Sequence, residues 1–169
     1  MRRSKRILIA GVGNIFLGDD AFGSEVARRL MQRALPLEVH VRDFGISVYD
    51  LAYAMMDGYD ATILLDTTAL GQSPGTVYLI EPAFDELDKL ASIVGNAHSM
   101  TPVNVLQMVR SLGGSPGKLY LVGCEPATLE SDEGSMELSE SVEAAVPRAI
   151  ERIESLVMEL LSVNQNAEI

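Results

Sequence analysis

Three side chains that could bind a metal ion stand where predicted strands and turns end: Asp20, Asp66 and His98. Asp20 follows a glycine-rich turn, Asp66 closes an apolar run, and His98 precedes a predicted helix. Two carboxylates and an imidazole form a mixed ligand set, and three ligands leave positions open for substrate or water. Each residue type is also common in caps, turns and structural hydrogen bonds, so the pattern alone leaves both roles open.

The segment that positions Asp20 is ILIAGVGNIFLGDDAFG, residues 7–23. Its four leading apolar residues are typical of a strand buried on both faces, and Gly11 and Gly13 then break the run. A helical pattern follows, which we place at residues 20–34, and Pro36 lies beyond its end. A strand, a glycine-rich turn and a helix predict the opening unit of an α/β domain.

Asp19 and Asp20 decide between two interpretations of this turn. A dinucleotide site has the pattern G-x-G-x-x-G and places a pyrophosphate on the helix N-terminus. Phe16 occupies the third glycine position here, and the two carboxylates would repel a phosphate and attract a cation. We interpret Asp19 as a helix N-cap. A functional role for Asp20 depends on the resemblance described below.

The rest of the chain continues the alternation of strands and helices. Apolar patterns predict strands at residues 39–43, 61–65, 76–80 and 119–122, and helices at residues 47–56, 82–94, 102–112 and 139–161. The connection from the third strand to the fourth is too short for a parallel crossover, so we predict that these two are antiparallel neighbours. The fifth strand follows a crossover that contains a helix and should run parallel to the first.

These elements predict a three-layer α/β/α sandwich around a mostly parallel, twisted sheet of about five strands, one of them antiparallel. We expect one domain over residues 1–163 and a frayed tail at residues 164–169. If the first three strands lie in the order 2-1-3, Asp20 and Asp66 line one crevice at the topological switch point. The segment that returns from the fourth strand should bring His98 to the same edge of the sheet as Asp20 and Asp66. His40 lies within a predicted edge strand, and we interpret it as a structural residue.

Acidic residues outnumber basic ones, 24 to 13, which gives a net charge of −11 over 169 residues. This balance argues against nucleic acid and favours a cationic or metal-bearing partner.

The single cysteine, Cys124, cannot form an internal disulfide, which fits the cytoplasm. We interpret it as a buried thiol, with a nucleophile as the alternative. No stretch approaches the ~20 apolar residues that a membrane span requires. The basic residues at the start of the sequence resemble the beginning of a signal peptide, but we interpret the apolar run that follows them as the first strand.

Acidic residues concentrate in residues 125–137, which carry Glu125, Glu130, Asp132, Glu133 and Glu137. Two interpretations are open. The segment is either a solvated surface loop, or a rim beside the site that attracts a basic residue of the partner and so affects its association rate.

Several motifs, in this order and spacing, resemble the [NiFe]-hydrogenase maturation endopeptidase family. They are GVGNIFLGDDAFG at residues 11–23, LLD at 64–66 followed by SPGTV at 73–77, and AHSM at 97–100. DFGIS at residues 43–47 resembles the D-G-G-T/S turn of that family, but Phe44 replaces a glycine and leaves the role of Asp43 open. GCEP at 123–126 and LSESVEAAVP at 138–147 are similar to its C-terminal portion.

The resemblance implies an endopeptidase that removes a C-terminal extension from a hydrogenase large-subunit precursor after nickel insertion. The metal-contacting residues of the family correspond to Asp20, Asp66 and His98, which are then also the catalytic residues. Nickel carried by the substrate would polarise the scissile carbonyl or activate water, with no organic cofactor. We expect a monomer whose partner is this precursor. The alternative is a non-enzymatic metal- or nucleotide-binding Rossmann-like module.

Overall fold

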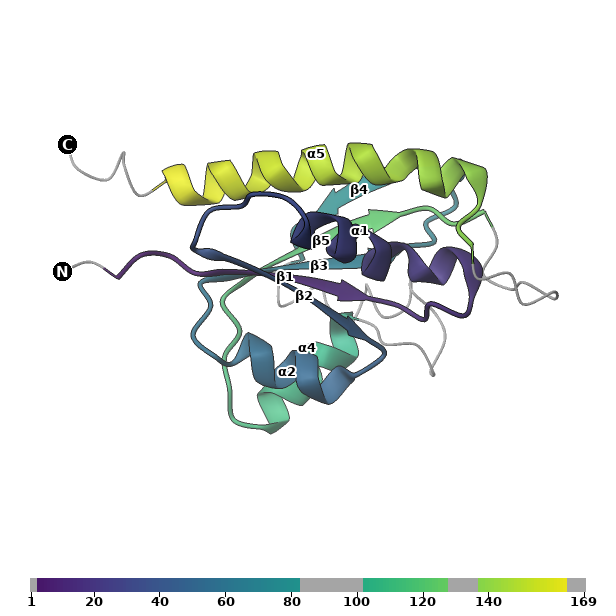
Figure 1. The fold of residues 1–169 in the computed structure, drawn as a ribbon. Helices are drawn as coiled ribbons and strands as arrows, with labels where there is room; N and C mark the ends of the chain where they lie inside the picture. Colours follow the sequence, from purple (N-terminus) through teal and green to yellow (C-terminus); the bar gives the residue numbers. More distant parts are fainter. Residues whose placement is uncertain (1–2, 83–101, 128–136, 164–169) are drawn as a thin grey trace.

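The computed structural model describes residues 3–82, 102–127 and 137–163 of the chain (Figure 1). Its elements alternate between strands and helices, as the sequence predicts. In chain order they are β1 (Ile7–Val12), the 3-10 helix η1 (Gly18–Ala21), α1 (Phe22–Met31), β2 (Val39–Gly45), α2 (Val48–Met55), β3 (Ala61–Thr67), β4 (Val77–Ile80), α4 (Pro102–Ser111), β5 (Lys118–Cys124) and α5 (Glu140–Ser162). The helix predicted at residues 82–94 lies almost entirely outside the described residues.

The strands form one sheet in the order β2-β1-β3-β5-β4. Strands β2, β1, β3 and β5 are parallel, and β4 pairs with β5 in the antiparallel sense. The predicted order of the first three strands and the parallel orientation of the fifth are therefore confirmed. Because the parallel strands point the same way, their carboxyl ends share one edge of the sheet, and the switch point lies there between β1 and β3.

The prediction that β4 lies next to β3 is wrong, because β5 is inserted between them. The short connection determines the direction of β4 but does not determine its neighbour. Burial accounts for the order: nearly all of β5 is buried, as suits a central strand, whereas every residue of β4 is half-buried, as suits an edge.

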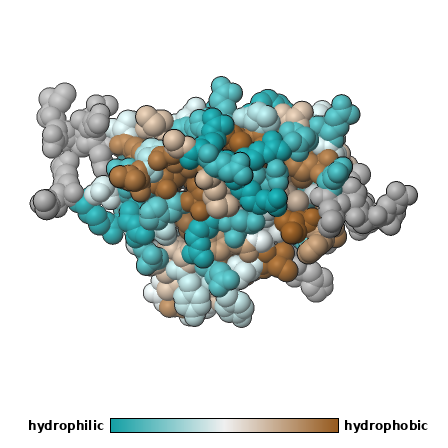
Figure 2. All heavy atoms as spheres, in the orientation of Figure 1, coloured by the Kyte–Doolittle hydropathy of each residue, from teal (hydrophilic) through white to brown (hydrophobic). Residues whose placement is uncertain are grey.

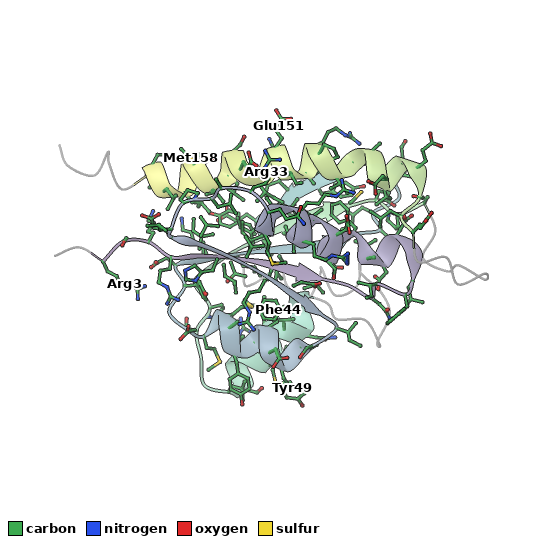
Figure 3. All side chains as sticks on the ribbon, in the orientation of Figure 1. Arg3, Arg33, Phe44, Tyr49, Glu151 and Met158 are labelled. Atoms are coloured by element: carbon green, nitrogen blue, oxygen red, sulfur yellow. The ribbon has the colours of Figure 1, made fainter. Side chains whose placement is uncertain are left out.

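Helices cover both faces of the sheet, which confirms the three-layer architecture (Figure 1). Helices α1 and α5 pack on one face and enclose a core that includes Phe22 and Ile153. Helices α2 and α4 pack on the other face around Leu51 and Leu106. Phe44, the residue that departs from the family's glycine, belongs to this second core, and in Figure 3 its ring lies between the sheet and α2.

The start of α2 agrees with the cap predicted from the sequence, and the start of α1 does not. Ser47 caps α2, because its side chain accepts a hydrogen bond from the N–H of Asp50, as expected. The first helix instead opens as the 3-10 turn η1, and α1 begins only at Phe22. Asp20 therefore lies in a tight turn before the α-helix and not in its first turn.

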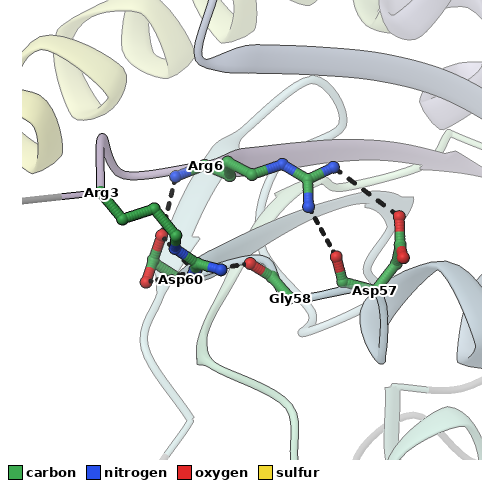
Figure 4. A network of polar contacts seen from close by, with 5 residues as sticks. All are labelled: Arg3, Arg6, Asp57, Gly58 and Asp60. Atoms are coloured by element: carbon green, nitrogen blue, oxygen red, sulfur yellow. Dashed lines mark hydrogen bonds and ion pairs between the residues drawn. The ribbon is translucent and has the colours of Figure 1, made fainter.

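Arginine side chains hold the start of the chain against the turn between α2 and β3 (Figure 4). Arg3 donates to the carbonyl of Gly58 at 2.9 Å and to the carboxylate of Asp60. The N–H of Arg6 donates to Asp60 at 2.7 Å, and its guanidinium donates to the carbonyl of Asp57. This network therefore lies at the amino ends of β1 and β3, away from the switch point.

Within the described ranges, no helix is both long and apolar enough to span a membrane.

Candidate functional site

Asp66 lies near the carboxyl end of β3 and is buried. Its Oδ1 accepts the N–H of Thr67 at 2.8 Å. Burial, and to a smaller extent the charge of Asp20, raises the pKa of the Asp66 carboxyl well above its usual value. A carboxylate in this position costs free energy when it is ionised, unless a cation lies beside it.

Asp20 reaches the same edge of the sheet from η1, across the switch point from Asp66. Its Oδ2 accepts the N–H of Asn14 at 2.9 Å. Partial burial raises the pKa of Asp20, and its hydrogen bond to Asn14 opposes that rise. The charge of Asp20 contributes to the raised pKa of Asp66, and the residues next to them in sequence are in contact, because the hydroxyl of Thr67 donates to the carbonyl of Asp19 at 2.7 Å. Two neighbouring carboxylates with raised pKa values form a site that suits a cation.

His98, the third predicted ligand, lies outside the described residues. Across residues 3–82, 102–127 and 137–163, no three His, Cys, Asp or Glu side chains are grouped as metal ligands. The structure therefore brings two of the three predicted residues together, and the complete ligand set stays a prediction.

Asp19 is not the N-cap that the sequence suggested. The N-cap residues of η1 and α1 are Leu17 and Ala21, and neither helix has a side-chain cap. The buried carboxylate of Asp19 instead accepts the N–H of Ala127 at 2.8 Å and the N–H and hydroxyl of Ser139 at 2.7 and 2.9 Å. Its own carbonyl accepts the hydroxyl of Thr67 at 2.7 Å. Asp19 thus ties the turn of Asp20 to the start of α5 and the exit of β5.

Replacing Asp19 with alanine should therefore destabilise the protein far more than loss of a cap would. The N–H groups of Ala127 and Ser139 would lose the charged, buried acceptor to which both donate, so we expect the free energy of unfolding to fall by about 2–4 kcal/mol. Ser139→Ala removes only the hydroxyl donor and should cost about 1 kcal/mol. Urea unfolding of both variants measures the difference, and equal stability of Asp19→Ala and the unmodified protein would contradict this assignment.

Asp43 connects the end of β2 to α1. Its Oδ1 accepts the hydroxyl of Ser24 at 2.7 Å and the N–H of Gly45 at 3.0 Å. Gly45 has a φ of +56°, which glycine adopts without strain. Through these two hydrogen bonds, Asp43 fixes the turn at the end of β2 and connects it to α1.

Glu125 lies neither in a solvated loop nor on an acidic rim, so both interpretations are wrong for this residue. Its side chain is buried, and its carboxylate accepts the N–H groups of Leu70 and Gly71 and the hydroxyl of Tyr78 at 2.6 Å. Burial acts against these hydrogen bonds, but together they lower the pKa of Glu125. Glu130, Asp132 and Glu133 lie outside the described residues. The spacing of the acidic residues does not indicate that Glu125 holds the connection between β3 and β4.

Cys124 is fully buried at the end of β5, as expected for a structural thiol. Burial, with a smaller contribution from the charge of Asp19, raises the pKa of the thiol to about 11. A thiol with such a pKa is almost entirely protonated at neutral pH, so Cys124 is poorly suited to act as a nucleophile.

A family model for hydrogenase maturation proteases matches residues 24–156. The match includes Asp66 and begins just after the turn of Asp20. The hydrogenase 2 maturation protease of Escherichia coli K12 is 34% identical over 150 residues, which cover 88% of each chain.

Solved structures agree with this match. The hydrogenase maturating endopeptidase HybD from E. coli superposes with a TM-score of 0.74 at 32% identity, over 91% of this chain and 93% of that one. The hydrogenase 2 maturation peptidase from a Thaumarchaeota archaeon gives a TM-score of 0.66 at 34% identity, over 90% of this chain and 98% of that one. These similarities cover nearly the whole chain, so they include its mostly parallel five-stranded sheet.

Proposed function

Because the chain belongs to the hydrogenase maturation protease family, we propose that it removes the C-terminal extension from the large-subunit precursor of a [NiFe]-hydrogenase. The cut would follow nickel insertion, and the nickel would arrive as part of the substrate. We further propose that the enzyme acts as a monomer in the cytoplasm.

The observation that supports this proposal is the pair of carboxylates at the switch point. Asp20 comes from η1 and Asp66 from β3, and the pKa values of both are raised. Both are held in place by backbone N–H groups, from Asn14 and Thr67 respectively. A divalent cation would relieve the repulsion between the carboxylates and so favour their ionised forms.

In this proposal, Asp20, Asp66 and His98 hold the nickel of the precursor beside the scissile bond. Nickel supplies Lewis acidity, either to the scissile carbonyl or to the attacking water. Two carboxylates and a neutral imidazole leave coordination positions for groups of the substrate. Because the metal belongs to the substrate, a precursor without nickel would lack part of the site and would not be cut.

The competing function, a metal- or nucleotide-binding module without catalysis, has weaker support. A phosphate at the turn after β1 would meet the carboxylate of Asp20, and Phe16 stands where a dinucleotide fold has its third glycine. Isothermal titration with NAD and with Ni²⁺ separates the two functions. Tight binding of NAD without binding of metal would favour the module.

The deciding experiment uses nickel-loaded and nickel-free precursor, followed by mass spectrometry of the precursor C-terminus. We expect cleavage of the loaded form alone. His98→Ala should abolish cleavage, because the proposed site loses its imidazole ligand. The variant should still fold, because we expect His98 to serve the site and not the hydrophobic core. His40→Ala is the matched control, because the other histidine of the chain lies on β2 and contacts the hydroxyl of Tyr59. Cleavage by His98→Ala at the unmodified rate would contradict the assignment.

A cysteine peptidase is the remaining mechanistic alternative, and Cys124→Ala tests it. We expect full processing activity, because a buried thiol with a pKa of about 11 does not supply a thiolate. Loss of the sulfur from a packed core should cost about 1–2 kcal/mol of stability, which urea unfolding measures. The native protein should also resist labelling by a thiol reagent until it is unfolded. Loss of cleavage by a folded Cys124→Ala variant would support the cysteine mechanism.

A further inference from the structure

Thr67, the last residue of β3, contacts both elements that carry the paired carboxylates. Its N–H donates to Oδ1 of Asp66 at 2.8 Å, and its hydroxyl donates to the carbonyl of Asp19 at 2.7 Å. That carbonyl belongs to the peptide unit that joins Asp19 to Asp20. Because a peptide unit is planar, a hydrogen bond to its oxygen also restrains the N–H and the Cα of Asp20. One residue therefore connects the two sides of the candidate site.

The hydroxyl of Thr67 lies where the pairing of β1 with β3 stops. The register of these two strands ends at the pair Gly11 and Leu65, two residues before Thr67. The register of β3 with β5 continues to the pair Thr67 and Cys124. The sheet thus holds the backbone of Thr67, whereas the spacing between β3 and the turn that follows β1 depends on contacts beyond this pairing. The hydrogen bond from Thr67 to Asp19 is such a contact.

The carbonyl of Asp19 also lies at the junction between η1 and α1. It accepts the N–H of Phe22, the first residue of α1, as well as the hydroxyl of Thr67. The N–H of Asp20 donates to the carbonyl of Leu17 at 3.2 Å, within the same turn. Without the hydroxyl of Thr67, the carbonyl of Asp19 would keep one donor. The turn should therefore persist, but with less restraint on its position relative to β3.

Thr67 is too well covered to bind the substrate protein itself. Only 8% of this residue is exposed, and η1 and α1 both contact β3. Figure 2 shows mainly hydrophilic side chains where Figure 1 places α1, and Thr67 lies in the layer beneath. Threonine is also branched at Cβ, which restricts its χ1 angle. A buried hydroxyl with a restricted rotamer suits a role in holding two elements at a fixed separation.

We propose that Thr67 is a positioning residue for the protease reaction and fixes the separation between the carboxylates of Asp20 and Asp66. The inference rests on the proposed function and deepens it, because it names a residue that acts on both proposed ligands without contact with the substrate. Removing a group that orients metal ligands typically costs about 10–100-fold in metal affinity or activity. Misplacing a reacting group by about 1 Å can cost a similar factor.

Thr67→Val tests this role, because valine has nearly the shape of threonine and lacks only the hydroxyl. We expect the affinity of the free protein for Ni²⁺, measured by isothermal titration, to fall about tenfold. The value of kcat/KM for nickel-loaded precursor should fall by about the same factor. Thr67→Ser restores the hydroxyl, so it should bring both quantities to within about threefold of the unmodified protein.

Ser139→Ala is the matched control, because it also removes one hydroxyl that donates to Asp19. That hydrogen bond goes to the carboxylate, which the N–H groups of Ala127 and Ser139 still hold. The urea midpoints of Ser139→Ala and Thr67→Val should fall by similar amounts, whereas Ser139→Ala should keep Ni²⁺ affinity and kcat/KM within about twofold. Equal losses of Ni²⁺ affinity in the two variants would indicate general loosening around Asp19 and would overturn the role of Thr67.

The two measurements separate failure of this inference from failure of the proposed function. If the unmodified protein cleaves the precursor and Thr67→Val matches it in both measurements, the positioning role is rejected and the proposed function stands. Equal impairment of Thr67→Ser and Thr67→Val also rejects the hydroxyl. If the unmodified protein binds Ni²⁺ but does not cleave, the proposed function fails, and the titration alone decides the role of Thr67. If the unmodified protein does not bind Ni²⁺, that role is overturned too.

Discussion

Replacing Asp66 with asparagine is expected to reduce processing of the precursor by about a hundredfold or more, while making the metal-free protein more stable at neutral pH. The loss of activity follows from the loss of an anionic ligand at the proposed site. The gain in stability follows from burial, because the ionised carboxylate of Asp66 is enclosed beside Asp20. Asparagine retains an oxygen that can accept the N–H of Thr67, so the local hydrogen bond need not be lost.

The stability difference should depend on pH in a defined direction. The pKa of Asp66 is raised in the folded state, so its protonated form favours folding. That contribution is complete below the unfolded pKa of about 4 and is lost as the pH rises through the folded pKa. The advantage of Asp66→Asn should therefore be small at pH 4 and larger at pH 7.

Urea unfolding of the metal-free protein at both pH values measures this effect. Asp57→Asn is the control, because its carboxylate is largely exposed and pairs with Arg6 at 3.7 Å at the other end of the sheet. It should change neither activity nor stability appreciably. A folded Asp66→Asn variant with normal cleavage would remove Asp66 from the site. An Asp66→Asn variant less stable than the unmodified protein at pH 7 would show that the carboxylate is stabilised by its surroundings.

Gly23→Ala should destabilise the fold by about 3 kcal/mol or more, although alanine normally favours a helix over glycine. A Cβ at this position would lie 2.0 Å from the carbonyl oxygen of Leu65 and 2.3 Å from that of Val12. Both oxygens belong to central strands, so neither can move away as a flexible side chain would. The absence of a side chain lets α1 approach β1 and β3 beside the switch point.

Gly113→Ala separates this clash from the general cost of replacing a glycine. Gly113 has a φ of +78°, and a Cβ there would meet no atom within 4 Å. We expect a loss of about 1 kcal/mol, from backbone conformation alone. Thermal and urea unfolding of both variants give the comparison. Equal losses for Gly23→Ala and Gly113→Ala would mean that the close approach of α1 to the sheet is relaxed at little cost.

Local patterns were sufficient for most of the architecture. The apolar run of β1, the cap at Ser47 and the helix after Ser139 each depend on residues close in sequence, and the order of β2, β1 and β3 follows from general rules of α/β topology. The approach of Asp20 to Asp66 could be predicted for the same reason. The place of β4 could not, because connection length constrains direction more than it constrains the neighbour.

Long-range partners explain the remaining differences. Asp19 has the sequence context of a cap, but its carboxylate binds backbone groups at positions 127 and 139, more than a hundred residues further along the chain. Glu125 is one of several acidic residues in its segment of the sequence. Only the folded chain brings the N–H of Leu70 and the hydroxyl of Tyr78 to its carboxylate. Neither assignment has a signal in the local sequence, since each depends on which strand ends share one edge of the sheet.

The contacts of Asp19 also bear on how members of this family could diversify. One carboxylate binds Ala127, three residues after β5, and Ser139, directly before α5, so both ends of the intervening segment are held by groups outside it. Lengthening a segment with fixed ends costs only about 0.6 kcal/mol for each doubling of its length. Insertions or grafts between residues 127 and 139 should therefore be accepted while the scaffold stays unchanged. Chimeras that exchange this segment between family members should therefore fold as stably as the unmodified protein, which urea unfolding can measure.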